Sequence, residues 1–355
     1  MHHLSRVWVG QVQLKARSER REARSSSDWL TLHRTTRGTE FIGIVPTRVL
    51  NPPGATGMRF WSLNPYVGCE FGCSYCYARE THQWTVERAA NQRDAPAAAR
   101  EAATLPIATG FERRILVKES APEILARTLD PVRLGDTPVV IGSATDPYQP
   151  AERRFEVTRR MLEVFLKYEG LHIGIITKSA LIARDTALLA MLARRHDVSV
   201  HFSIGSLDGA LLRQLEPRSA APAARLRVLR KLTDAGVRCD VLIMPILPGL
   251  TDGEPELREV VNGAKSAGAT SVAGGAVRMG PATRNTLLPW LDQHRPALAA
   301  RYRSHFRERQ YVSKRYGKAL HARLERLQRE GGFVGRARVT GTGEAKRMQG
   351  DLFAG

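Results

Sequence analysis

The sequence predicts an α/β protein built as a partial barrel of six strand–helix units, a (βα)6 arrangement of the TIM-barrel type. From residue 60 to about residue 300, short apolar segments alternate with amphipathic ones, the pattern of a parallel sheet with right-handed crossovers. A length of 355 residues with 43% hydrophobic content suits one main domain with appendages. The longest apolar stretch, residues 241–247, is far shorter than the ~20 residues of a membrane span. We therefore expect a cytoplasmic protein without membrane association.

The expected strands are short runs rich in β-branched residues, and each is followed by a polar loop. They cover residues 60–67, 138–143, 172–177, 198–204, 238–246 and 271–277. Helices are expected to follow several of them, over about residues 74 into the eighties, 121–129, 155–165, 179–195 and 286–300.

Three segments flank or interrupt this pattern. Residues 1–40 are polar and unpatterned, so we expect a flexible N-terminal extension before a core barrel over residues 41–300. Residues 41–48 have strand character and end at a Pro-Pro-Gly turn, which predicts a strand outside the barrel. Residues 89–103 are Ala-rich and predict an irregular insertion, and residues 301–355 predict a basic helical extension.

Three of the four cysteines, Cys69, Cys73 and Cys76, lie within one short loop in a C-x3-C-x2-C spacing. This grouping favours a shared ligand over scattered core thiols. An odd set of closely spaced thiols does not suit disulfides, and we expect no secretory signal and a reduced compartment. The loop therefore predicts a metal or cluster site.

Three thiolates without an obvious fourth suit a cubane 4Fe–4S cluster with one open iron, where chemistry can occur. Zinc is the alternative, with His82 as a fourth donor. Structural zinc sites usually take two ligands from each of two separated knuckles, which favours the cluster.

This motif, with Tyr75 before the third cysteine, resembles the radical S-adenosylmethionine (SAM) superfamily. The longer sequence Asn-Pro-Tyr-x-Gly-Cys-Glu-x-Gly-Cys-x-Tyr-Cys-Tyr-Ala-Arg, from Asn64 to Arg79, resembles the branch related to spore photoproduct lyase. The resemblance covers about residues 60–300 and implies a partial (βα)6 barrel that binds a 4Fe–4S cluster and SAM.

Barrel enzymes place their sites on the loops that follow the strands. This rule selects four polar residues at strand ends, Ser143, Asp146, Lys178 and Ser203. The resemblance implies that the second strand end holds the methionyl amine of SAM, and that the third and fourth hold its carboxylate and ribose. The alternative is that Ser143, Asp146 and Ser203 cap helices and that Lys178 is solvated.

Aromatic and polar residues near the cysteines are further candidates. The resemblance implies that Tyr75 lies by the adenine through its backbone. Tyr77 and Tyr148 are expected to flank the same mouth and are candidate catalytic residues that pass a hydrogen atom, with ordinary packing as the alternative. Asn64 and His82 are expected to brace the cysteine loop.

Later positions add one similarity and two departures. Glu216-Pro217-Arg218, with Arg225 beyond it, is similar to the family and could order a loop above the site; a surface ion pair is the alternative. Thr251 stands where relatives tend to carry Asn. Spore photoproduct lyase supplies hydrogen from a further cysteine between the cluster loop and the second strand, and here that interval has none. Cys239 opens the fifth strand and is expected in the core, so thymine-dimer splitting by that route is not expected.

The resemblance implies that one electron passes through the cluster to SAM, and that a 5′-deoxyadenosyl radical then abstracts hydrogen from a substrate. The formal charge of +19 attracts phosphates, so DNA or RNA is an expected substrate or partner. From Arg301 onward, however, there are fourteen Lys and Arg against five Asp and Glu, and a solvated arginine-rich face would look similar. The alternatives are a nucleic-acid-binding protein with a structural metal or cluster site and no turnover, and an enzyme for another substrate whose basic tail recruits an acidic reductant. Flavodoxin or ferredoxin is the expected reductant.

Overall fold

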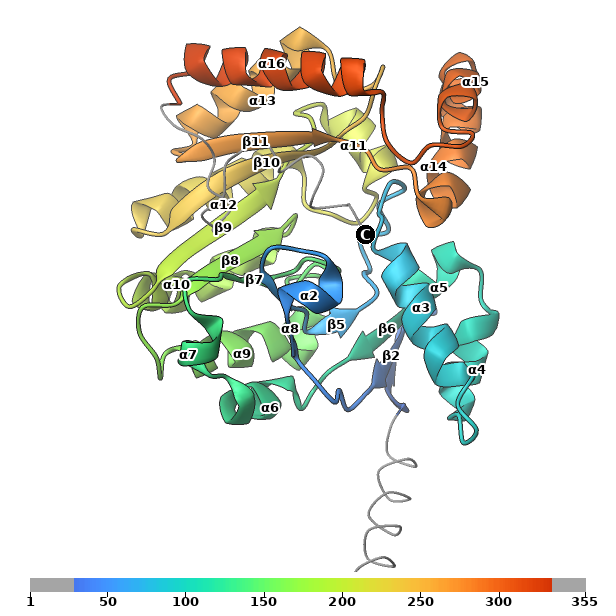
Figure 1. The fold of residues 1–355 in the computed structure, drawn as a ribbon, viewed down its shortest axis with the longest axis vertical. Coiled ribbons are helices and arrows are strands. Elements are labelled where there is room, and N and C mark those ends of the chain that lie inside the picture. The colour runs from blue at the N-terminus through green and yellow to red at the C-terminus, as the bar shows by residue number, and fades with distance from the viewer. Residues whose placement is uncertain (1–28, 334–355) are drawn as a thin grey trace, which may run out of the picture.

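Six parallel strands form the centre of the molecule, as the sequence predicts. The computed structural model describes residues 29–333. In it, the parallel strands lie side by side in the order β4, β7, β8, β9, β10, β11 (Figure 1). Their bounds are Trp61–Leu63 (β4), Val139–Ile141 (β7), His172–Thr177 (β8), Asp197–Ser203 (β9), Arg238–Ile246 (β10) and Ser271–Ala276 (β11). The predicted partial (βα)6 barrel is confirmed.

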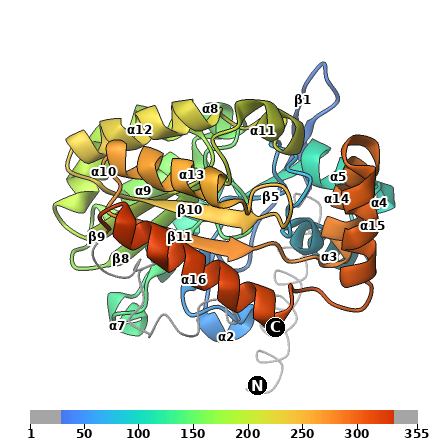
Figure 2. The ribbon, with the colours of Figure 1, turned by 90° about the horizontal axis from the view of Figure 1, so that it is seen from above.

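The helices between these strands cover the outer side of the sheet, and the strand ends point toward α3 and α14 (Figure 2). Ser179 begins the connection after β8, where its hydroxyl accepts a hydrogen bond from the amide of Leu181. The crossover helices are α6 (Ala121–Thr128), α7 (Pro131–Leu134), α8 (Glu152–Phe155), α9 (Val157–Phe165), the 3-10 helix η1 (Ala180–Asp185), α10 (Thr186–Ala193), α11 (Gly209–Leu215), α12 (Pro222–Asp234) and α13 (Glu254–Ser266).

The first predicted strand, residues 60–67, is wrong as one element. The chain leaves the barrel at Asn64 and forms β5 (Tyr66–Val67), which pairs with β6 (Arg114–Val117) in a second sheet. That sheet has the order β1, β2, β6, β5. The break at Asn64-Pro65 places the cysteine loop between the two sheets.

The second sheet also contains the strand predicted outside the barrel, since β2 covers Glu40–Gly43. The expected N-terminal extension is partly structured, because β1 (Leu30–Arg34) pairs with β2. Residues 1–28 lie outside the described part. At the barrel edge, β3 (Leu50–Asn51) pairs antiparallel with β4, and α2 (Pro53–Thr56) connects them.

The segment after the cysteines is helical. The helix expected from residue 74 begins at residue 79, as α3 (Arg79–Ala90). The prediction of an irregular insertion over residues 89–103 is wrong, because α4 (Ala97–Thr104) packs on α3. Its buried alanines, Ala99 and Ala102, allow this close approach. The next helix, α5 (Ile107–Arg113), leads into β6.

The C-terminal segment is part of the barrel wall. The expected boundary at residue 300 falls inside α15 (Pro296–His305), which follows α14 (Pro281–His294). The long helix α16 (Lys314–Glu330) packs on α13 and β11 (Figure 2). It buries Leu320, Leu324 and Leu327, which recur at helical spacing. Residues 334–355 lie outside the described part.

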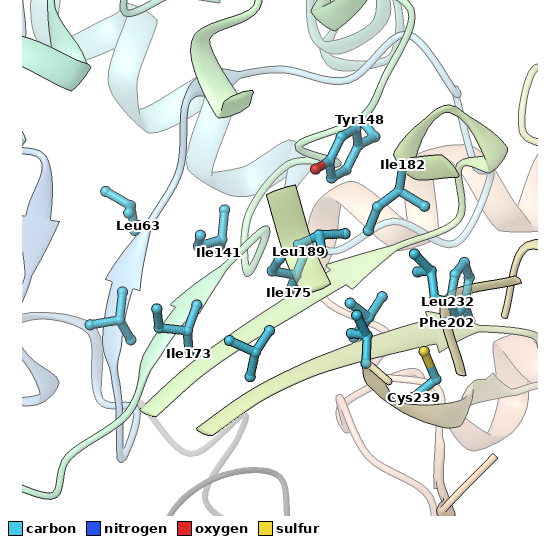
Figure 3. Packing of buried hydrophobic residues seen from close by; sticks show 14 of the residues in the cluster. Leu63, Ile141, Tyr148, Ile173, Ile175, Ile182, Leu189, Phe202, Leu232 and Cys239 are labelled. Carbon is cyan, nitrogen blue, oxygen red and sulfur yellow. The ribbon is translucent and has the colours of Figure 1, made fainter. Parts of the chain in front are cut away.

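The main core fills the space between the strands and these helices. Cys239 is fully buried beside Phe202 and Leu232 (Figure 3), as expected for a core thiol. Within residues 29–333, no helix combines the length and apolar character needed to cross a bilayer.

Candidate active site

A cavity at the carboxyl ends of the parallel strands contains the three clustered cysteines. Its wall includes Cys69, Cys73 and Cys76 together with all four strand-end residues selected from the sequence, Ser143, Asp146, Lys178 and Ser203. The space between these side chains, including the open mouth, is about 1260 Å³, comparable to the clefts of roughly 300–1,000 Å³ that bind small molecules. The structure brings these residues together around one cavity.

Glycine conformations shape the cysteine loop and the strand end opposite it. Gly68 has a φ of +91°, and a Cβ there would lie 2.9 Å from the carbonyl oxygen of Phe111. Gly142 has a φ of +94° and ends β7, and a Cβ there would lie 2.5 Å from the carbonyl oxygen of Ile176. Both positions require glycine because they combine a left-handed backbone with a close approach.

The Asn64 side chain, which we expected to brace the cysteine loop, instead braces the end of β7. Its amide nitrogen donates to the hydroxyls of Ser62 at 2.9 Å and Ser143 at 3.1 Å, and its side-chain oxygen accepts from the amide of Ala144 at 2.9 Å. Lys118 donates to the Asn64 carbonyl at 2.9 Å. These bonds tie the residue at which the chain leaves the barrel to a cavity wall.

His82 lies behind the cysteine loop. Its Nε2 lies 2.8 Å from the carbonyl oxygen of Arg114, and its ring packs edge-on against Phe111. Burial lowers the pKa of His82 to about 4, so the ring is neutral and Nε2 donates to this carbonyl. His82 is therefore engaged as a brace rather than as the fourth ligand of the zinc alternative. Among residues 29–333, no three His, Cys, Asp or Glu side chains are arranged to hold a single metal ion.

Asp146 fixes the backbone at the end of β8. Its Oδ1 accepts from the Thr177 hydroxyl at 2.8 Å and the Tyr148 amide at 2.9 Å, and Oδ2 accepts from the Lys178 amide at 2.7 Å. Burial raises the pKa of Asp146, while these donors and the charge of Lys178 oppose the rise. The carboxylate thus places Lys178 at the cavity wall.

Lys178 is the cationic group most available to a ligand. Its ammonium lies 5.8 Å from the centre of the Tyr75 ring and has no hydrogen-bond or ion-pair partner within the described residues. The Ser203 side chain also lines the cavity, while its carbonyl accepts from Arg225 at 2.7 Å. Ammonium and hydroxyl groups of this kind suit the carboxylate and diol of a nucleoside-linked amino acid.

The tyrosines separate into two groups. Tyr75 and Tyr77 line the cavity; the Tyr75 hydroxyl donates to Glu216 and the Tyr77 hydroxyl donates to the Ser143 carbonyl. The expectation that Tyr148 flanks the mouth is wrong. Tyr148 is fully buried beside Ile182 (Figure 3), and its hydroxyl donates to Asp185 at 3.1 Å. Tyr148 is therefore part of the core and does not line the cavity.

The Glu216–Arg225 pair is buried, so the surface alternative is wrong. Both side chains have 0% exposure, and Arg225 also donates to the carbonyls of Ser203 and Ala220. Glu216 accepts from Tyr75, which places the pair directly behind the cysteine loop. Its position supports the expectation that it orders the loop.

Other supports of the cysteine loop were missed in the sequence. Gln149, fully buried, donates to the Gly68 carbonyl at 3.1 Å and accepts from the Glu70 amide at 2.9 Å. Arg79, also buried, donates to the Cys73 carbonyl at 2.9 Å. The available signal was position, since both are polar residues within the motif or the loop after β7.

The comparisons with known proteins decide the family. A family model described as "Radical SAM superfamily" matches residues 63–261, more than half of the chain. The chain belongs to the radical SAM superfamily. Its relatives include an uncharacterised protein of Mycobacterium tuberculosis, 30% identical over 303 residues that cover 83% of this chain and 84% of the relative. Another, from Methanocaldococcus jannaschii, is 27% identical over 215 residues, covering 61% of this chain and 71% of the relative.

Solved structures support the radical SAM fold. A spore photoproduct lyase mutant with bound AdoMet and dinucleoside spore photoproduct aligns with a TM-score of 0.58 and 14% identity, covering 82% of this chain and 79% of the other. Spore photoproduct lyase complexed with the dinucleoside aligns with a TM-score of 0.56 and 14% identity, with the same coverage. At this identity the likeness shows the fold alone.

The cofactors of a radical SAM protein are a 4Fe–4S cluster and SAM, and this donor set fits both. A four-iron cluster distributes three thiolates over three iron atoms, and Cys69, Cys73 and Cys76 border one cavity while Cys239 is in the core. Burial raises the pKa of all three thiols, and Lys178 and Arg79 oppose the rise at Cys73 and Cys76 respectively. Bound iron would deprotonate them. This chain is therefore a radical SAM enzyme, and the structural comparisons relate its fold to that of spore photoproduct lyase.

Proposed function

We propose that this radical SAM enzyme cleaves SAM reductively and abstracts hydrogen from a nucleic-acid base. When bound, the cluster and SAM supply the electron transfer and the 5′-deoxyadenosyl radical. The observation that carries the proposal is the shared cavity, whose wall contains the three thiols and the polar ends of β7, β8 and β9. An acidic electron carrier such as flavodoxin or ferredoxin is the proposed reductant.

The residues of the cavity have separate roles in this proposal. Lys178 binds the SAM carboxylate, and Ser143 and Ser203 contact its amine and ribose sides. Asp146 holds the Lys178 backbone in place. Apolar side chains including Phe71, Phe111, Ile176, Leu242 and Val277 line the remaining wall and exclude water from the reaction.

Tyr77 is the proposed hydrogen-atom donor on the substrate side. It lines the cavity next to Cys76, whereas Cys239 is buried in the core and Tyr148 lies outside the cavity wall. No cysteine lies between Cys76 and β7, so that segment supplies no thiol donor. Nucleic acid is supported as the substrate by the formal charge of +19 and by the fold shared with proteins solved with a dinucleoside lesion.

The test is anaerobic reconstitution with iron and sulfide, followed by dithionite reduction with SAM and chromatography of 5′-deoxyadenosine. Wild type should form it, and Cys73→Ala should not, because the cluster loses one of its three ligands. Cys239→Ala is the matched control: it also removes one thiol, but from the core, and should retain product formation.

A wild-type protein that holds four iron atoms with sulfide and yet forms no 5′-deoxyadenosine would refute the enzyme and favour the binding protein without turnover.

If 5′-deoxyadenosine is formed, damaged DNA and RNA are added to the active enzyme to test the substrate. A nucleic acid whose damaged base is lost only when SAM is added to the reduced enzyme is the substrate. No change in any nucleic acid would refute that part of the proposal.

A further inference from the structure

Arg278 is a second cation at the cavity, on the side away from Lys178. It follows β11, lines the cavity, and its side chain is 18% exposed. Tyr77 lines the same cavity. Arg278 follows the last strand of the sheet, whereas Lys178 follows β8.

The two cations come from well-separated strand ends. Three strand spacings separate the ends of β8 and β11, which at ~4.8 Å each is roughly 14 Å along the sheet. The Asp146 carboxylate in the wall already accepts three hydrogen bonds from the protein at the Lys178 end. If Lys178 serves SAM, Arg278 is left for another ligand.

The guanidinium of Arg278 is held in place but only partly engaged. Its Nε donates to the Gln310 side chain at 3.0 Å, and the Gln310 carbonyl accepts from the Met279 amide at 2.7 Å. Arg284 fastens the same loop by donating to the carbonyls of Met279, Arg307 and Arg309. A guanidinium anchored in this way loses little freedom on binding.

Glu80 is a weak partner for this arginine. Its Oε2 lies 3.4 Å from Nη1, longer than the ~2.7–2.9 Å of a strong charged hydrogen bond, and Nη2 of Arg278 has no partner within residues 29–333. The fork of the guanidinium therefore retains donors for two oxygens of one ligand. The segment before Gln310 is exposed and carries Arg307, Glu308 and Arg309, a net charge of one positive unit.

We propose that Arg278 binds an oxyanion of the substrate, a phosphate or a carboxylate, and so selects for anionic substrates. This inference rests on the proposed function only in assigning the anion to the substrate of the enzyme. Gln310 is a positioning residue that holds the guanidinium toward the cavity.

The test is calorimetric titration of the full-length, reconstituted, SAM-bound protein without reductant. The phosphate probes are thymidylyl-thymidine and its uncharged methylphosphonate analogue. The carboxylate probes are succinate and its diamide. The variants are Arg278→Met, which removes the charge, and Arg278→Lys, which keeps the charge and loses the fork. Arg127→Met, on the exposed side of α6, is the matched control.

Arg278→Met should weaken binding of one charged probe at least about tenfold, with Arg278→Lys between it and wild type, and Arg127→Met should bind as wild type does. Dependence in the thymidylyl-thymidine series supports a phosphate-bearing substrate, and dependence in the succinate series supports a carboxylate. The proposal is overturned if wild type binds none of the probes, binds charged and uncharged probes equally, or keeps its affinity in both Arg278 variants. Because no turnover is involved, anion binding without 5′-deoxyadenosine would refute only the proposed function.

Discussion

Replacement of Arg225 by methionine should destabilise the protein more than almost any other single charge removal. Arg225 and Glu216 both have 0% side-chain exposure, and Arg225 donates to two carbonyls, at 2.7 Å each, and to the Ser219 hydroxyl at 2.6 Å, besides Glu216. Methionine fills a similar volume but leaves the Glu216 carboxylate charged and buried. Breaking a buried pair in this way costs about 3–5 kcal/mol.

The assay is urea unfolding of the apo-protein at pH 7 under reducing conditions. Arg225→Met should lower the free energy of unfolding by that amount. The double variant Glu216→Gln with Arg225→Met should lose less than the two single variants together, because it leaves neither charge alone in the core. The matched control is Arg303→Met, which breaks an exposed pair with Asp292 and should leave the urea midpoint unchanged.

The pH dependence gives an independent check of the same pair. Burial alone would raise the pKa of Glu216, but the charges of Arg225 and Lys178 and the hydrogen bonds to this carboxylate lower it below 4.5. A lowered carboxyl pKa contributes stability above pH 4.5 that is lost as pH falls through the folded value. The stability difference between wild type and Glu216→Gln should therefore shrink below pH 4.5. A loss under about 1 kcal/mol in Arg225→Met, or additive losses in the double variant, would contradict the buried pair.

Two further predictions concern Gly142, after β7, and Lys118, which donates to the Asn64 carbonyl. Gly142→Ala should cost at least about 1–3 kcal/mol of stability in urea unfolding, because Gly142 has a φ of +94° and the Ile176 carbonyl oxygen lies 2.5 Å from the new Cβ. The control is Gly54→Ala, whose new Cβ meets no atom of the described residues within 4 Å apart from its chain neighbours, and which should change stability by less than about 1 kcal/mol. Equal losses in the two variants would refute the steric reasoning. Burial lowers the pKa of Lys118 from 10.5 to about 8, so the folded state disfavours its charge below pH 8 and recovers this cost as pH rises to 10.5. The stability of wild type relative to Lys118→Met should therefore increase between pH 8 and 10.5, and a flat or falling difference would show that Lys118 is solvated.

Strand positions were predictable from the sequence because apolar runs between polar loops have few other uses. The bounds of β8 and β10 agree with prediction, β9 differs by one residue at each end, and β11 differs by one residue at its C-terminal end. The first strand differs because Asn64 and Pro65 interrupt a run that is apolar on both sides, and the pairing of β5 with β6 depends on residues 50 positions away. Asn64-Pro65 is a local signal for the break, but no local signal indicates which sheet the next strand joins.

Within the site, chemistry was more predictable than orientation. The thiols and the strand-end residues share the cavity because strand ends meet at one edge of the barrel. The prediction for Tyr148 was wrong because the direction of its side chain depends on Asp185, 37 positions later, which accepts a hydrogen bond from the Tyr148 hydroxyl. The burial of Glu216 and Arg225 was equally hidden, since a charged pair at the end of α11 and in α12 looks the same in sequence whether solvent reaches it or not.

The supports of the cysteine loop also set an order on biosynthesis. The Tyr75 hydroxyl reaches Glu216, 141 positions later, and Thr286 donates to the Ser74 carbonyl from 212 positions later. At ~5–20 residues per second of translation, Thr286 emerges about 10–40 s after the loop. During this interval the three thiols are synthesised but their cavity is incomplete. Iron–sulfur delivery to this loop therefore belongs after barrel closure, and the cell has to keep the thiols reduced until then.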